Sequence, residues 1–169
     1  MRRTEGSTLS HYKAGIHWER GDQDFLAGRY SRAHRLRFDG GLDIAGSSSP
    51  HVVPLPWSDP AALDPEEAFV SSIASCHMLW FLALAAKDGW CVENYRDNAE
   101  GEMRKNAKGK LFVSRVRLRP AVLFSGPSRP DADALATLHH RAHEECFIAN
   151  SVLTEIVCEP VFAPAMTQA

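Results

Sequence analysis

The chain lacks the features that mark secreted, membrane-bound or nucleic-acid-binding proteins. Its first ten residues, MRRTEGSTLS, carry two arginines but no apolar run behind them, so we expect no signal peptide. A net charge of −2 gives no overall positive field to attract nucleic acid or an anionic membrane. Only four cysteines occur. In a chain without export signals, they predict a cytoplasmic protein whose thiols are buried, catalytic or metal-bound.

Internal repeats, domain linkers and a second long apolar run are also missing. The 169 residues therefore predict a single domain over 1–169, with loose termini at about 1–10 and 163–169. The one long apolar run, residues 68–86, approaches the length of a membrane span. Three serines and a histidine interrupt it, and two glutamates precede it. A helix that is apolar on all sides is otherwise a core helix, so we predict a buried helix and no membrane.

This apolar run has well-defined helix boundaries. Asp64 fits the N-cap, Pro65 fits the first helical position, and Glu67 fits the position that closes a capping box. Lys87 and Gly89 suit the C-terminal end. The sequence therefore predicts one long central helix between these signals.

Alternating polar and apolar residues predict strands on both sides of the helix. Residues 28–38 alternate, and the turn DGG leads into a returning strand, LDIAG. Residues 90–104 and 110–124 resemble two long strands around the turn NAKG; in the second, apolar residues alternate with arginines. A second helix over 131–145 and a last strand over 151–158 follow. This order of elements indicates an α+β domain with antiparallel sheet.

Two cysteine-containing segments form the most specific pattern in the chain. DPEEAFVSSIASCHMLWFLALAAK places Cys76 ten residues after Glu66, and AHEECFIANSV places Cys146 70 residues further on. Together they resemble the OsmC/Ohr family, the osmotically inducible and organic hydroperoxide resistance proteins, over roughly residues 11–162. The resemblance implies antiparallel sheets wrapped around a long buried central helix, and an intertwined homodimer.

The resemblance also implies a thiol-dependent peroxidase that reduces organic hydroperoxides without a cofactor or metal. The Cys76 thiolate would attack the peroxide and become a sulfenic acid, and Cys146 would condense with it to a disulfide. An external dithiol, of which a lipoyl group is one candidate, would restore both thiols. The family uses an arginine, held by a glutamate, to favour the thiolate. Glu66 matches that glutamate by position; the alternative is that Glu66 only favours the positive end of the helix.

The arginine is harder to assign. The proline-rich loop 47–63 contains none, so we take the candidates from the alternating segment 28–38. We choose Arg32, because it shares a face with Tyr30 and His34. The other candidates in this segment are Arg29, Arg35 and Arg37.

Glu66 and Cys76 have a further consequence for assembly. Ten residues of straight helix separate them by about 15 Å in rise. If both serve one active site, the simplest geometry is a two-fold dimer in which antiparallel central helices bring Glu66 of one chain near Cys76 of the other. Apolar walls around the thiol would come from Phe69, Trp80, Phe147 and Trp57.

Two other functions remain as alternatives. The first is a non-catalytic, OsmC-like binding or structural dimer. The second is a metal-binding protein that uses His139, His143 and Cys146, whose spacings of four and three place them on one helix face. For this histidine cluster, which includes His140, we favour a polar helix face. His77 lies about 100° around the helix from Cys76, which suggests a polar group satisfied in the core. Cys91 and Cys158 fit small apolar strand residues.

Overall fold

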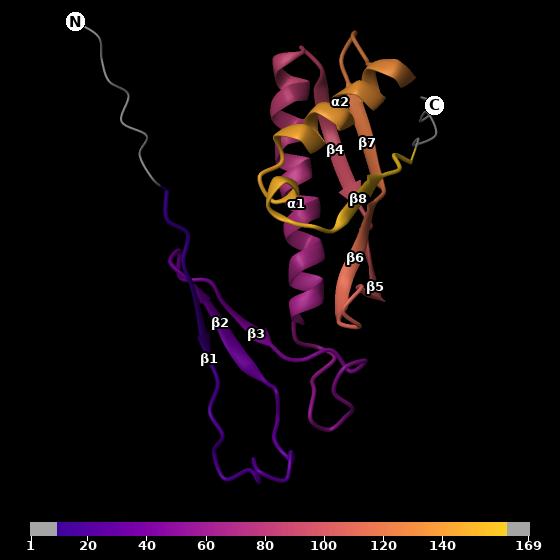
Figure 1. Cartoon of the computed structure of the whole chain (residues 1–169). Coiled ribbons are helices and arrows are strands. Elements are labelled where there is room, and N and C mark those ends of the chain that lie inside the picture. Colours follow the sequence, from indigo (N-terminus) through magenta and orange to yellow (C-terminus); the bar gives the residue numbers. More distant parts are fainter. Residues whose placement is uncertain (1–9, 162–169) are drawn as a thin grey trace, which may run out of the picture. The chain divides into compact units, whose positions relative to one another are not determined.

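The computed structural model describes residues 10–161, which form two compact units divided after Pro65 (Figure 1). The first unit contains β1 (Ala14–His17), β2 (His34–Phe38) and β3 (Asp43–Gly46). The elements that follow are α1 (Pro65–Lys87), β4 (Cys91–Asp97), β5 (Glu100–Lys105), β6 (Leu111–Leu118), β7 (Pro120–Ser125), α2 (Ala132–Glu145), the short 3-10 helix η1 (Ala149–Ser151) and β8 (Glu155–Cys158). The expected loose termini lie outside the described residues, apart from Ser10. The single domain over 1–169 stays a prediction.

The first unit is a three-stranded antiparallel sheet in the order β1-β2-β3. Its β2–β3 hairpin confirms the predicted turn, but β2 begins only at His34, so the strand predicted over 28–38 is too long. The backbone before His34 bonds elsewhere, because the N–H of Ser31 donates to the Gln23 side chain and that of Arg32 donates to the Trp57 carbonyl. Strand β1 was not predicted.

The central helix α1 begins and ends where the capping signals predict. Gly89 follows it with φ of +81°, a left-handed conformation that glycine adopts without steric cost. The buried residues Ile73, His77, Phe81 and Ala85 recur every four positions, so one face of the helix is buried. By length and composition alone α1 could cross a membrane, but the core helix of a soluble protein passes the same test. The burial of this face against α2 and the strands fits a core helix.

The second unit confirms the predicted α+β class but divides each predicted long strand in two. Residues 90–104 form β4 and β5, and residues 110–124 form β6 and β7. The strands change pairing partner at this break. Strand β4 pairs with β7, and β5 pairs with β6, both antiparallel. The Asp97 side chain accepts a hydrogen bond from the Arg119 N–H at 2.7 Å, and Pro120 has no N–H to continue a ladder. The last strand starts at Glu155 rather than 151 and pairs with β6 in parallel.

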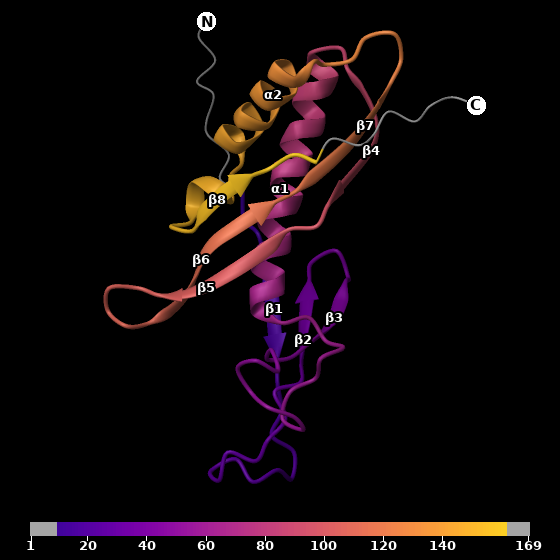
Figure 2. The same cartoon turned by 90° about the vertical axis from the view of Figure 1, so that its right-hand side faces the viewer.

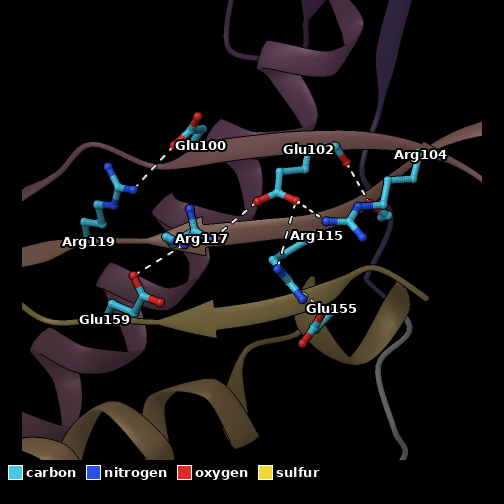
Figure 3. A network of polar contacts seen from close by, with 9 residues as sticks. Glu100, Glu102, Arg104, Arg115, Arg117, Arg119, Glu155 and Glu159 are labelled. Atoms are coloured by element: carbon cyan, nitrogen blue, oxygen red, sulfur yellow. Dashed lines mark hydrogen bonds and ion pairs between the residues drawn. The ribbon is translucent and has the colours of Figure 1, made fainter.

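The sheet β5-β6-β8 has one charged and one apolar face, as the alternation in β6 predicts. Glu102 is centred among Arg104, Arg115 and Arg117, at 3.1, 4.0 and 3.4 Å (Figure 3). On the other face, Val116 and Leu118 are fully buried and pack with Ile73 of α1. A second cluster joins Phe81 and Ala85 of α1 to Leu138 and Ala142 of α2. Accordingly α1 runs beside the strands, with α2 next to its C-terminal half (Figure 1, Figure 2).

Candidate active site

The fold brings Cys76 and Cys146 into contact, although 70 residues separate them. Cys76 lies in the middle of α1. Cys146 is the C-cap of α2, where an extended ψ of 110° ends the helix and turns the chain. Its sulfur accepts a hydrogen bond from the Ala149 N–H at 3.4 Å and hydrogen bonds with Cys76. Both cysteines are free thiols, so this is a reduced dithiol pair.

The two sulfurs differ in access and acidity. Cys146 is only 1% exposed, whereas Cys76 is half-buried. Burial, followed by the hydrogen bond with Cys76, raises the pKa of the Cys146 thiol to about 11. Cys146 is therefore protonated at neutral pH and closed to solvent, and Cys76 is the sulfur that an incoming molecule can reach.

Two of the four aromatic residues predicted to line the site, Trp80 and Phe147, lie next to the two cysteines. Trp80 lies one helical turn after Cys76, and its ring meets that of Phe147 edge-on at 5.4 Å between centroids. Phe147 is 66% exposed. Phe69 instead packs around Ile73 in the core, and Trp57 belongs to the first unit.

Glu66 and Arg32 occupy different parts of the chain. Glu66 lies half-buried in the first turn of α1, about 15 Å in helical rise from Cys76. Arg32 belongs to the first unit, where its guanidinium lies 3.8 Å from the centre of the Tyr30 ring and donates to the Tyr30 carbonyl at 2.5 Å. Their roles as activating residues stay predictions.

The metal trio considered as an alternative, His139, His143 and Cys146, is not assembled. Helix α2 ends at Glu145, so Cys146 leaves the helical face and turns toward Cys76. Among residues 10–161, the side chains grouped closely enough to hold a metal ion are instead those of His77, His139 and Cys158. No sequence pattern pointed to Cys158, which resembles an ordinary strand residue.

Both imidazoles of this group are buried. His77 is 1% exposed and His139 is 3% exposed. His77 Nε2 lies 3.1 Å from His139 Nδ1, so His77 finds a polar partner in the core, as expected. Burial lowers the pKa of His77 to about 4 and that of His139 to about 3, which leaves both rings neutral at pH 7. Burial also raises the pKa of the Cys158 thiol to about 12.

Comparisons with known proteins agree with this fold. The family model for OsmC-like proteins matches residues 58–160. An OsmC-like protein of unknown function from Vibrio cholerae is 54% identical, with a TM-score of 0.88 over 90% of this chain and 100% of its own. No curated protein sequence matches the chain.

Organic hydroperoxide resistance proteins share the same architecture at low sequence identity. That of Elizabethkingia anophelis is 15% identical, with a TM-score of 0.66 over 94% of this chain and 99% of its own. That of Bacillus subtilis is 16% identical, with a TM-score of 0.63 over 92% of this chain and 100% of its own. At this identity the likeness shows the fold alone. With its helix boundaries, paired cysteines and matching family model, the chain belongs to the family of OsmC-like proteins.

Proposed function

We propose that this protein is a thiol-dependent peroxidase that reduces organic hydroperoxides to alcohols. The family associates the fold with peroxide-related redox chemistry. The observation that carries the proposal is the contact between an accessible thiol, Cys76, and a buried one, Cys146. A dithiol with one open and one closed sulfur suits a division between attack and resolution.

The proposed reaction uses both sulfurs and returns both. The Cys76 thiolate forms a bond to one peroxide oxygen, the O–O bond breaks, and the alkoxide takes a proton to leave as an alcohol. The Cys146 sulfur then attacks the sulfenic acid, forming an S–S bond and releasing water. An external dithiol reduces this disulfide by exchange. Because Cys146 already hydrogen bonds with Cys76, it is placed to capture the sulfenic acid before further oxidation.

Activation of Cys76 and assembly of the protein belong to the same proposal. A guanidinium stays charged in any site, so Arg32, held by Glu66, would favour the Cys76 thiolate. A homodimer would cover apolar residues of α1 that the single chain leaves open, of which Leu79 is 59% exposed. We place this chemistry in the cytoplasm, where free thiols persist.

A titration of free thiols tests the proposal. The reduced chain has four. One equivalent of tert-butyl hydroperoxide should remove two thiols, and dithiothreitol should restore them. The variant lacking both Cys91 and Cys158 should still lose two, since neither takes part. A count that stays unchanged after peroxide would contradict the peroxidase and favour a non-catalytic binding dimer.

The walls of the site predict a preference for organic hydroperoxides over hydrogen peroxide. Apolar burial contributes roughly 0.8 kcal/mol per methylene, or about fourfold in kcat/KM for each one covered. We expect a higher kcat/KM for cumene hydroperoxide than for hydrogen peroxide, measured by coupled turnover. Trp80→Ala should bring the two kcat/KM values closer together, whereas Phe112→Ala, which changes a partly exposed aromatic residue of β6, should preserve their ratio. Equal values for both peroxides would rule out an alkyl-binding wall.

A further inference from the structure

The buried group formed by His77, His139 and Cys158 is separate from the dithiol pair and has no part in the proposed peroxidase reaction. It joins three elements: His77 comes from α1, His139 from α2, and Cys158 from the end of β8. Its three potential ligand atoms lie within 4.8 Å of one another. Neither a helix face nor a sequence motif creates it, since residues 77, 139 and 158 meet only in the folded chain.

We propose that His77, His139 and Cys158 form a zinc-type metal site. A tetrahedral zinc ion holds neighbouring nitrogen and sulfur ligands about 3.3–3.6 Å apart, given its bond lengths of about 2.0 Å to nitrogen and 2.3 Å to sulfur. Here His77 Nε2 lies 3.1 Å from His139 Nδ1 and 3.8 Å from Cys158 Sγ. These separations require only small movements to close around an ion.

Packing already holds the two imidazoles in place. The His77 and His139 rings are nearly parallel, at 6°, with centroids 5.4 Å apart. The Phe81 ring stacks on the His139 ring, with 4.4 Å between the two ring centroids. Rigid neighbours reduce the ordering that a ligand must otherwise impose.

As a hydrogen-bonded cluster, the group is incomplete. His77 Nδ1 and His139 Nε2 are buried without a partner in the described residues. A neutral pair of imidazoles shares one N–H with one lone pair, so one donor and one acceptor remain unused in either tautomer. Leaving a buried polar atom unpaired is unfavourable, because the atom has lost its hydrogen bonds to water. Coordination through the inner nitrogens would fix the proton of each ring on its outer nitrogen. It would not pair these outer atoms, so the metal–ligand bonds themselves would have to outweigh the cost of two buried N–H donors.

A cavity gives the group an entrance and a fourth position. It has a volume of about 260 Å³ and is lined by His139, His143 and Cys158, among others. A structural or catalytic zinc site needs a fourth ligand, for which this cavity has room. On binding, the Cys158 thiol would release its proton to solvent as the S–metal bond forms. The donor set, two imidazoles and one thiolate, suits zinc and its spectroscopic substitute cobalt.

Titration of the chelator-stripped, reduced full-length protein with Zn²⁺ and Co²⁺ tests this site. We expect one ion per chain, a rise in Tm with Zn²⁺ that EDTA reverses, and for Co²⁺ a thiolate charge-transfer band with tetrahedral d–d bands. Cys158→Ala should abolish the charge-transfer band and weaken metal binding at least about 100-fold. Removing a residue that only hydrogen bonds to a metal ligand already costs up to about 100-fold in affinity, and Cys158 would be a ligand itself. His139→Ala should also remove the d–d bands.

Three matched variants separate this site from other thiols and imidazoles. Cys91→Ala removes an exposed cysteine, and His17→Ala removes an exposed histidine of β1 in the first unit. The double variant Cys76→Ser/Cys146→Ser removes the proposed redox pair. All three should bind Co²⁺ with the parent spectrum. Absence of stoichiometric binding, survival of the charge-transfer band in Cys158→Ala, or its loss in the double variant would each overturn the proposal.

Discussion

Cys76→Ser should reduce hydroperoxide turnover to the uncatalysed background, whereas Cys146→Ser should consume one equivalent of peroxide and then stop. The difference follows from the two positions. Cys76 is the thiol that solvent can reach, while Cys146 is 1% exposed and its pKa is raised to about 11. A serine hydroxyl in place of Cys76 is not a nucleophile toward peroxide under these conditions. Stopped-flow turnover of cumene hydroperoxide measures both variants.

The Cys146→Ser variant also gives a direct chemical signature. Without its partner, the oxidised Cys76 should persist as a sulfenic acid, which a dimedone-type reagent traps and peptide mass spectrometry locates. Cys91→Ser is the matched control and should turn over like the parent, because Cys91 is an exposed strand residue. Turnover at the parent rate in Cys76→Ser would show that the assigned mechanism is wrong.

Mixing Glu66→Ala with Cys76→Ser chains should restore activity that neither variant has alone. Along one straight α1, Glu66 and Cys76 are separated by about 15 Å of rise, and helical side chains lean toward the N-terminus, which carries Glu66 further away. One arginine cannot bridge that separation within a chain. In a two-fold dimer with antiparallel central helices, each site would combine Glu66 of one chain with Cys76 of the other.

The expected recovery can be calculated. Random exchange of equal amounts gives about half mixed dimers, each with one intact site of two, so about a quarter of the parent activity should return. Subunit exchange is verified with differently tagged chains by native mass spectrometry. Glu67→Ala is the control, since it removes a neighbouring charge from the same helical turn and should retain turnover. If exchange is complete and no activity returns, the shared site is excluded.

Local patterns predicted α1 and α2 because their signals are local. The cap at Asp64, the proline after it and the glycine at 89 act within one or two turns, so they fix a helix wherever it packs. The alternation of Val116 and Leu118 with arginines likewise predicted the two faces of β6, with the charged face carrying the ion pairs of Glu102. The same reasoning predicted hairpin strands that are longer than the observed ones. A strand ends where it changes its pairing partner, and that depends on residues far away in the sequence.

The sequence by itself determined the helix boundaries, the two-faced strand, the paired-cysteine pattern and, through them, the family. Tertiary structure alone decided which side chains meet. It put Cys146 against Cys76 rather than with His139, because α2 ends one residue before Cys146 and the chain turns there. It also gathered His77, His139 and Cys158 from three elements. Periodicity and capping act over a few residues, whereas such contacts depend on how whole elements pack, which no local pattern encodes.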